Sequence, residues 1–131
     1  MEAAPATKPL TITEDNFEQF VTQDGIAVID WWAPWCAPCR MFAPVLDKAA
    51  VNHPQMRFGK VNTDEQRSLS AAFDIQSIPT LMIFRDHILL FSQPGALPAS
   101  AFEDLLSQVQ KLDMDEVRRK VAEKQQDKAS A

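Results

Sequence analysis

The sequence predicts a single α/β domain built around a mixed β-sheet. Apolar runs of strand length alternate with segments of helical periodicity, the last two strands are joined too tightly to be parallel, and 131 residues is a length that fits one domain. A domain of this size buries enough apolar surface to fold without a metal or a disulfide. The expected order of elements is β-α-β-α-β-α-β-β-α, followed by a charged tail.

A flexible segment, a short strand and a helix are predicted at the start of the chain. Residues 1–9 are rich in Ala and Pro and are expected to be disordered. The pattern from Leu10 to Ile12 favours a short strand. Thr13 carries a side chain suited to cap the helix that follows, and Gly25 is expected to end that helix.

A buried strand and a long helix come next. Residues 26–32 are almost entirely apolar, which is typical of a strand covered on both faces. Pro34 ends this strand, and a helix fits residues 35–52. A kink is expected at Pro44, because proline removes one backbone hydrogen bond and clashes with the preceding turn.

The second half of the domain is predicted to supply three more strands and two helices. A strand over residues 56–62 and a helix over residues 66–73 come first. The apolar runs 81–84 and 88–92 are separated by a tight turn and predict a β-hairpin. Pro98 suits the first turn of a final amphipathic helix.

The tail over residues 113–131 differs in pattern from the domain over residues 10–112. Its apolar positions are out of phase with the preceding helix, and Asp113 with Glu116 resembles a capping pair. We therefore expect a break in the chain at this point, followed by a separate, weakly docked helix.

Composition argues against several classes of function. The chain has 13 basic and 18 acidic side chains, and this net charge of −5 argues against nucleic-acid binding. With only 3 Gly, the chain has no Gly-rich phosphate-binding loop. No apolar run approaches the roughly 20 residues of a membrane span, and residues 1–11 lack the pattern of a signal peptide. We expect a monomer of the reducing cytoplasm, where structural disulfides are rare.

The two cysteines, Cys36 and Cys39, are the strongest functional signal. At the start of a helix they are spaced to form a disulfide, and the sulfur of Cys36 lies near unpaired N–H groups and the positive end of the helix dipole. Both features favour the thiolate, which is the nucleophile in thiol–disulfide exchange. Such a dithiol can attack a substrate disulfide with the first sulfur and expel the reduced substrate by closing the Cys36–Cys39 bond.

Three other interpretations of the cysteine pair stay open at this stage. Zinc binding would use His53 as a third ligand, because its separation from the cysteines in the sequence resembles that of a zinc finger. His87 lies far outside the usual spacing. An iron–sulfur cluster could be bridged between two chains, and the cysteines could also be inert. The position of the C-x-x-C motif directly after a buried strand favours exchange.

Asp30 and Pro79 are the other unusual positions. A carboxylate inside an apolar strand carries a large desolvation penalty, and burial favours its protonated form. Asp30 is expected beneath the cysteine pair, where it could accept or relay the proton that Cys39 must lose. The alternative is a simple ion pair with Lys60, and both can hold together. Pro79 is a candidate for a cis peptide, with an ordinary trans proline as the alternative.

Several stretches of the sequence resemble thioredoxins, and they occur in the order found in that family. The matching stretches are residues 28–40, 43–44, 60–62, 77–80 and 95–97. The resemblance covers about residues 10–112 and is strongest to the bacterial thioredoxin-2 branch, without the N-terminal zinc module that its members often carry, so no zinc role carries over. It implies the thioredoxin fold, in which helices flank both faces of a central mixed sheet.

The resemblance also implies roles for individual residues. Cys36 would be the attacking cysteine and Cys39 the buried resolving one, with Asp30 as a buried acid beside Lys60. Pro79 would be cis.

A substrate surface and a source of electrons are implied as well. The backbone from Ile78 to Thr80 would pair with an extended substrate segment, and Trp35, Pro79 and Gly95 would line a shallow apolar contact surface. No bound cofactor is implied, because the electrons would come from NADPH through a flavin-dependent thioredoxin reductase. The expected partners are that reductase and client proteins that contain disulfides.

The sequence departs from the family pattern at a few positions. Ala37 replaces the usual Gly between the cysteines, and Asp74 and His87 stand where Gly is common, so a positive φ is expected at both. No His lies between the cysteines, which favours a reductant over an oxidant. We predict a protein-disulfide reductase. The alternatives are an isomerase or oxidant of the same type, and a thioredoxin-like holdase or assembly module with incidental redox activity.

Overall fold

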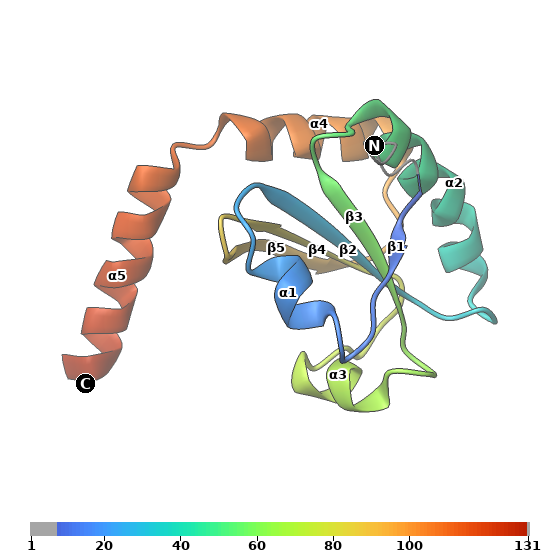
Figure 1. The fold of residues 1–131 in the computed structure, drawn as a ribbon, viewed down its shortest axis with the longest axis horizontal. Helices are drawn as coiled ribbons and strands as arrows, with labels where there is room; N and C mark the ends of the chain where they lie inside the picture. The colour runs from blue at the N-terminus through green and yellow to red at the C-terminus, as the bar shows by residue number, and fades with distance from the viewer. Residues whose placement is uncertain (1–7, 131) are drawn as a thin grey trace, which may run out of the picture.

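A five-stranded sheet forms the centre of the computed structural model, which describes residues 8–130. Residues 1–7, which belong to the segment predicted to be flexible, lie outside the described residues. The strand order is β1-β3-β2-β4-β5, with β1 and β2 parallel to β3 and with β4 antiparallel to both β2 and β5, so the sheet is mixed as predicted (Figure 1). The strands are β1 (Leu10–Thr11), β2 (Ile26–Trp32), β3 (Arg57–Asn62), β4 (Thr80–Arg85) and β5 (Ile88–Pro94).

Helices cover both faces of this sheet. The helices are α1 (Phe17–Val21), α2 (Ala37–Asn52), α3 (Arg67–Ala72), α4 (Ala99–Lys111) and α5 (Met114–Ser130). Apolar side chains of α2 and α4 share one core cluster with the sheet, and those of α1 share the other cluster, against which α3 also packs. None of the helices within residues 8–130 combines the length and apolar character that a membrane span requires.

Strand β2 runs through the middle of the sheet, which explains its apolar sequence. Its side chains are buried from Ile26 to Trp31. Val28 packs in the cluster under α2 and α4, whereas Trp31 packs on the opposite face, with its ring 5.6 Å from that of Phe73. A strand with helices on both faces has no polar side, as the sequence pattern predicted.

Gly59 in β3 lies where the packing leaves no room for a side chain. A Cβ at this position would lie 2.6 Å from Cγ1 of Ile12, which is itself fully buried, and 3.0 Å from the ring of Phe20. We expect Gly59→Ala to lower the free energy of unfolding by about 1–3 kcal/mol, because overpacking displaces neighbouring side chains. Urea denaturation tests this prediction, and an unchanged midpoint would contradict the packing described.

The boundaries of the first helix differ from the prediction. The N–H of Thr13 donates to Oδ1 of Asn16 at 2.7 Å, and Oγ1 of Thr13 accepts the N–H of Asp15 at 3.2 Å. These local bonds form a turn, so the prediction of Thr13 as the cap was wrong and α1 begins only at Phe17. The prediction that Gly25 ends the helix was also wrong, because α1 ends four residues earlier and Gly25 leads into β2 with a φ of 93°.

The start of α2 also lies later than predicted. Cys36 keeps an extended backbone and serves as the N-cap residue, so the helix begins at Ala37 rather than at Trp35. The helix then continues through Pro44 without a break.

The hairpin and the tail agree with the sequence. Strands β4 and β5 form an antiparallel hairpin, and φ is positive at Asp74 and His87, as expected, and also at Asp86. After the break beyond α4, Oδ1 of Asp113 accepts the backbone N–H groups of the next helix at 3.1 and 3.3 Å.

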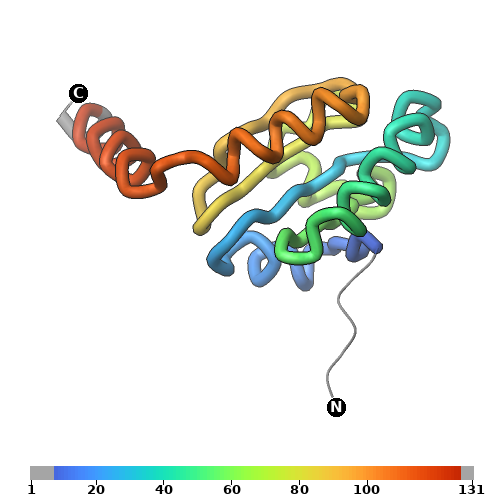
Figure 2. Tube along the Cα trace, turned by 90° about the horizontal axis from the view of Figure 1, so that it is seen from above, coloured from blue at the N-terminus to red at the C-terminus, as the bar shows by residue number. Residues whose placement is uncertain are grey.

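Helix α5 extends away from the sheet (Figures 1 and 2). Its first two turns are tied to the domain by the buried side chain of Met114 and by Arg118, whose guanidinium lies 3.9 Å from the carboxylate of Asp86. The guanidinium of Arg85 donates to the carbonyls of Val109 and Leu112 at the end of α4. The tail therefore forms a separate helix, as predicted.

Candidate active site

The two cysteines lie where β2 ends and α2 begins. They are joined by a disulfide with 5.2 Å between their Cα atoms, and both side chains are buried. Cys36 is the N-cap residue of α2, and its Sγ accepts the backbone N–H of Cys39 at 3.2 Å. This sulfur therefore receives an N–H that has no partner within the helix, at the positive end of the helix dipole.

The loop before β4 comes against the same sulfur. The carbonyl oxygen of Ile78 lies 3.7 Å from Sγ of Cys36, and the peptide between Ile78 and Pro79 is cis, as predicted. Gly95, with a φ of 111°, donates its N–H to the carbonyl of Pro79 at 2.8 Å. Thr80 begins β4 and donates its hydroxyl to the carbonyl of Ser77. The structure thus brings the predicted substrate-contact residues of this loop and Gly95 together beside Cys36.

Trp35 lies at the rim of this site, with 67% of its surface exposed. Its Nε1–H donates to Oδ2 of Asp64 at 2.9 Å, which ties the indole to the segment that follows β3. Sequence reasoning missed Asp64. The signal was its place just after β3, because the carboxyl ends of the parallel strands β2 and β3 meet at one edge of the sheet.

Asp30 is buried in β2, with 1% of its surface exposed. It shares the face of Val28, which packs under α2, and of Trp32, which packs against the cysteine pair. Neither carboxylate oxygen has a hydrogen-bond partner among residues 8–130. Burial raises the pKa of Asp30 to about 7, with a smaller upward effect from Asp47 and an opposing effect from Lys60.

Lys60 contacts an aromatic ring rather than the buried acid. It is the register partner of Asp30 on β3, but its Nζ lies 4.5 Å from the ring centre of Trp32, over the face of the indole. Because the oxygens of Asp30 make no bond in the described chain, the interpretation as a simple ion pair was wrong. Lys60 acts on Asp30 through space, together with Asp47, which the sequence reasoning missed.

The comparisons with known proteins decide between the interpretations of this site. Residues 8–111 match the model of the family described as Thioredoxin. The chain belongs to the thioredoxin family.

Individual thioredoxins resemble the chain over most of their length. A Streptomyces coelicolor protein named "Putative thioredoxin 2" is 52% identical over 119 residues, which cover 91% of this chain and 89% of the relative. Thioredoxin 1 of Synechococcus elongatus is 44% identical, with 72% and 91% of the two chains covered. Among solved structures, a mutant thioredoxin from Halobacterium salinarum matches with a TM-score of 0.76 and 26% identity, covering 86% of this chain and 98% of that chain.

As a thioredoxin with a bonded Cys36–Cys39 pair, the chain is a thiol–disulfide oxidoreductase that reduces protein disulfides. The zinc interpretation was wrong on geometric grounds. Cys39 lies in the first turn of α2 and His53 at its other end, roughly 20 Å away at 1.5 Å per residue. Nε2 of His53 instead lies 2.6 Å from Oε1 of Glu103 in α4, and no group of three or more His, Cys, Asp or Glu side chains in residues 8–130 is placed to hold a metal.

Proposed function

We propose that this thioredoxin transfers two electrons to client proteins by a two-step exchange at Cys36 and Cys39. The Cys36 thiolate attacks one sulfur of a client disulfide, which forms a mixed disulfide and releases one client thiolate. The Cys39 thiolate then attacks the sulfur of Cys36, which releases the second client thiolate and restores the internal disulfide. The observation that carries this proposal is the N–H of Cys39, which donates to Sγ of Cys36 at the start of α2.

Asp30 is proposed to accept the proton that Cys39 loses before the second step. A base works best with a pKa near the operating pH, and burial raises the pKa of Asp30 to about 7. Its face of the sheet is the one that α2 covers, and its oxygens are free of other bonds in the described chain. Lys60 and Asp47 are proposed to tune this acid in opposite directions.

The client is proposed to bind beside Cys36 as an extended segment. The backbone of Ile78, Pro79 and Thr80 would pair with it, and Trp35 and Gly95 would supply apolar contact area. Support comes from the exposed indole of Trp35 and from the carbonyl of Ile78, which lies 3.7 Å from the sulfur of Cys36.

Electrons are proposed to reach the protein from NADPH through a flavin-dependent thioredoxin reductase in the cytoplasm. The domain over residues 10–112 would act as a monomer with no bound cofactor, because the reversible disulfide itself carries the two electrons.

Cys39→Ser is expected to trap the mixed disulfide, because the attacking sulfur stays and the resolving sulfur is gone. Mass spectrometry without reducing agent should show the variant bonded covalently through Cys36 to an insulin chain. Cys36→Ser is the matched control and should form no such adduct. Multiple turnover by Cys39→Ser at the wild-type rate would contradict the assigned order of attack.

A further inference from the structure

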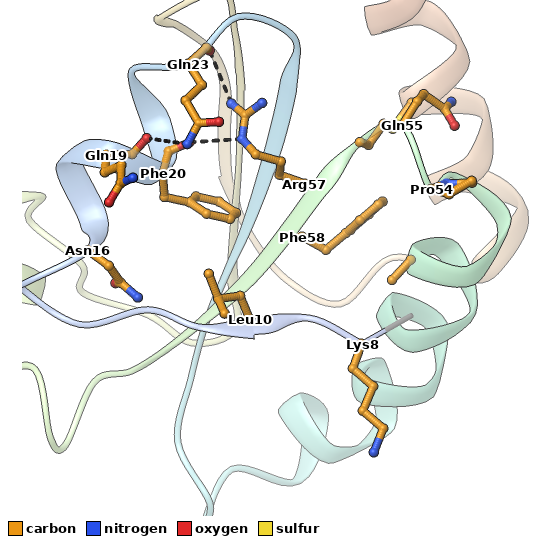
Figure 3. A pocket seen from close by; sticks show the side chains of 12 residues that line it. Lys8, Leu10, Asn16, Gln19, Phe20, Gln23, Pro54, Gln55, Arg57 and Phe58 are labelled. Carbon is orange, nitrogen blue, oxygen red and sulfur yellow. Dashed lines mark hydrogen bonds between the residues drawn. The ribbon is translucent and has the colours of Figure 1, made fainter. Parts of the chain in front are cut away.

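The pocket that Figure 3 shows is lined by residues at the start of β3, whereas the disulfide lies beyond the other end of that strand. Strand β3 begins at Arg57 and ends at Asn62, which pairs with Trp32 just before the cysteines. Strand β1 pairs with β3 only from Gly59 onward, so within the described part of the chain Arg57 and Phe58 have no neighbouring strand on that side. The volume of about 500 Å³ lies within the range of small-molecule sites, about 300–1,000 Å³.

The pocket has an apolar floor and a rim of amides. Phe20, Met56 and Phe58 are buried side chains of the lining, and Leu10 adds an exposed apolar side chain. The amide side chains of the lining are those of Asn16, Gln19, Gln23 and Gln55. An apolar floor with a few polar groups at its edge is the usual composition of a small-molecule site.

The two charged side chains that line the pocket are both basic. Among residues 8–130, its lining contains Arg57 and Lys8 but no carboxylate, and the side chain of Lys8 points away from the other labelled residues in Figure 3. No carboxylate oxygen in the described chain lies within ion-pair distance of Arg57. Burial lowers the pKa of Arg57, because the guanidinium has lost part of its hydration. The negative charge of Asp24 raises this pKa by a smaller amount, so the net shift is downward.

The guanidinium of Arg57 has donors to spare. It donates three hydrogen bonds to the backbone carbonyls of Phe20, Gln23 and Asp24, at 3.2, 3.2 and 2.8 Å, and it lies 5.7 Å from the ring centre of Phe20. A guanidinium carries five N–H donors, so two have no acceptor among residues 8–130 and remain for a ligand. These contacts hold the group in place at one end of the pocket (Figure 3).

We propose that this pocket binds a small carboxylic acid with an apolar body. The carboxylate accepts the free N–H groups of Arg57, and the apolar body lies against Phe20, Leu10 and Phe58. Such a ligand supplies the negative charge that the lining lacks and covers the apolar floor. Because the disulfide lies beyond the other end of β3, binding leaves disulfide reduction unchanged.

Indole-3-butyrate is a suitable probe, and its alcohol 4-(indol-3-yl)butanol and the amine tryptamine are controls for charge. In a ¹⁵N NMR titration of the full oxidised chain, the acid should produce saturable shifts at Gln23, Gln55 and Arg57. The alcohol should bind about tenfold more weakly, which is the effect expected of one charge-assisted contact. Equal affinity for acid and alcohol, or shifts confined to Trp35 and Cys36, would overturn the proposal.

Gln55 offers a matched pair of variants that spares the fold. Replacing Arg57 would also free one carbonyl of α1 and two of the loop between α1 and β2, whereas Gln55 is exposed on the rim. Gln55→Glu should weaken indole-3-butyrate binding by about fivefold, and Gln55→Lys should preserve or strengthen it. Both variants should reduce insulin at the wild-type rate. Affinities that do not separate in this order would overturn the proposed role of charge.

Discussion

Cys36→Ser is expected to abolish the reduction of insulin disulfides, lowering turnover by a factor on the order of 10³ or more. The hydroxyl of serine stays protonated near neutral pH and cannot form a disulfide with the client or with Cys39. In the wild-type protein the sulfur at this position accepts the N–H of Cys39 at the start of α2, so the structure stabilises a negative charge at the reacting atom.

The control for this variant separates chemistry from folding. Cys36→Ser cannot form the internal disulfide, so its free energy of unfolding should be compared with that of the reduced wild-type protein. If the two free energies of unfolding are similar and the variant is inactive, the result supports Cys36 as the nucleophile. Activity within about tenfold of wild type would contradict it.

Asp30→Asn is expected to stabilise the protein in a manner that depends on pH. The pKa of Asp30 rises from 3.8 to about 7 on folding. As the pH rises through 3.8, the unfolded chain releases this proton while the folded protein keeps it, so the unfolded state gains stability until the pH passes about 7. Asparagine removes this penalty. The free energy of unfolding of Asp30→Asn, relative to that of the wild-type protein, should therefore rise by about 4 kcal/mol between pH 4 and pH 8.

Urea denaturation of both oxidised proteins across this pH range measures the effect. Ile29→Val is the control, because Ile29 is buried in the same strand on the opposite face of the sheet and carries no titratable group. Its unfolding free energy should differ from wild type by an amount that stays constant between pH 4 and pH 8. A constant difference for Asp30→Asn as well would contradict a buried, unpaired carboxylate.

The sequence was informative where local patterns decide the structure. The apolar run of β2, the cysteine spacing and Asp30 inside a strand each predicted a feature that the structure confirms, because burial on both faces leaves a direct mark on residue type. The only sequence signal for Asp64 is its place just after β3. Its bond to Trp35 depends on how the ends of β2 and β3 meet, which is a tertiary property.

Other features could not be predicted because several elements compete for the same group. Lys60 had both a buried acid and an aromatic ring within reach, and the ring of Trp32 holds the ammonium in the structure. The start of α1 was misplaced because Thr13 and Asn16 bond to each other in a turn. The pocket at Arg57 arises from the short pairing of β1 with β3, and the residue pattern gave no sign of that pairing length.

The rate of Cys36 alkylation as a function of pH tests the central claim most directly. Iodoacetamide reacts with the thiolate, so the pH of half-maximal rate reports how far the start of α2 favours the charged sulfur. In the reduced protein, Cys36 should reach its half-maximal rate at a clearly lower pH than a cysteine in a short unstructured peptide. A profile that coincides with that of the peptide would contradict the account.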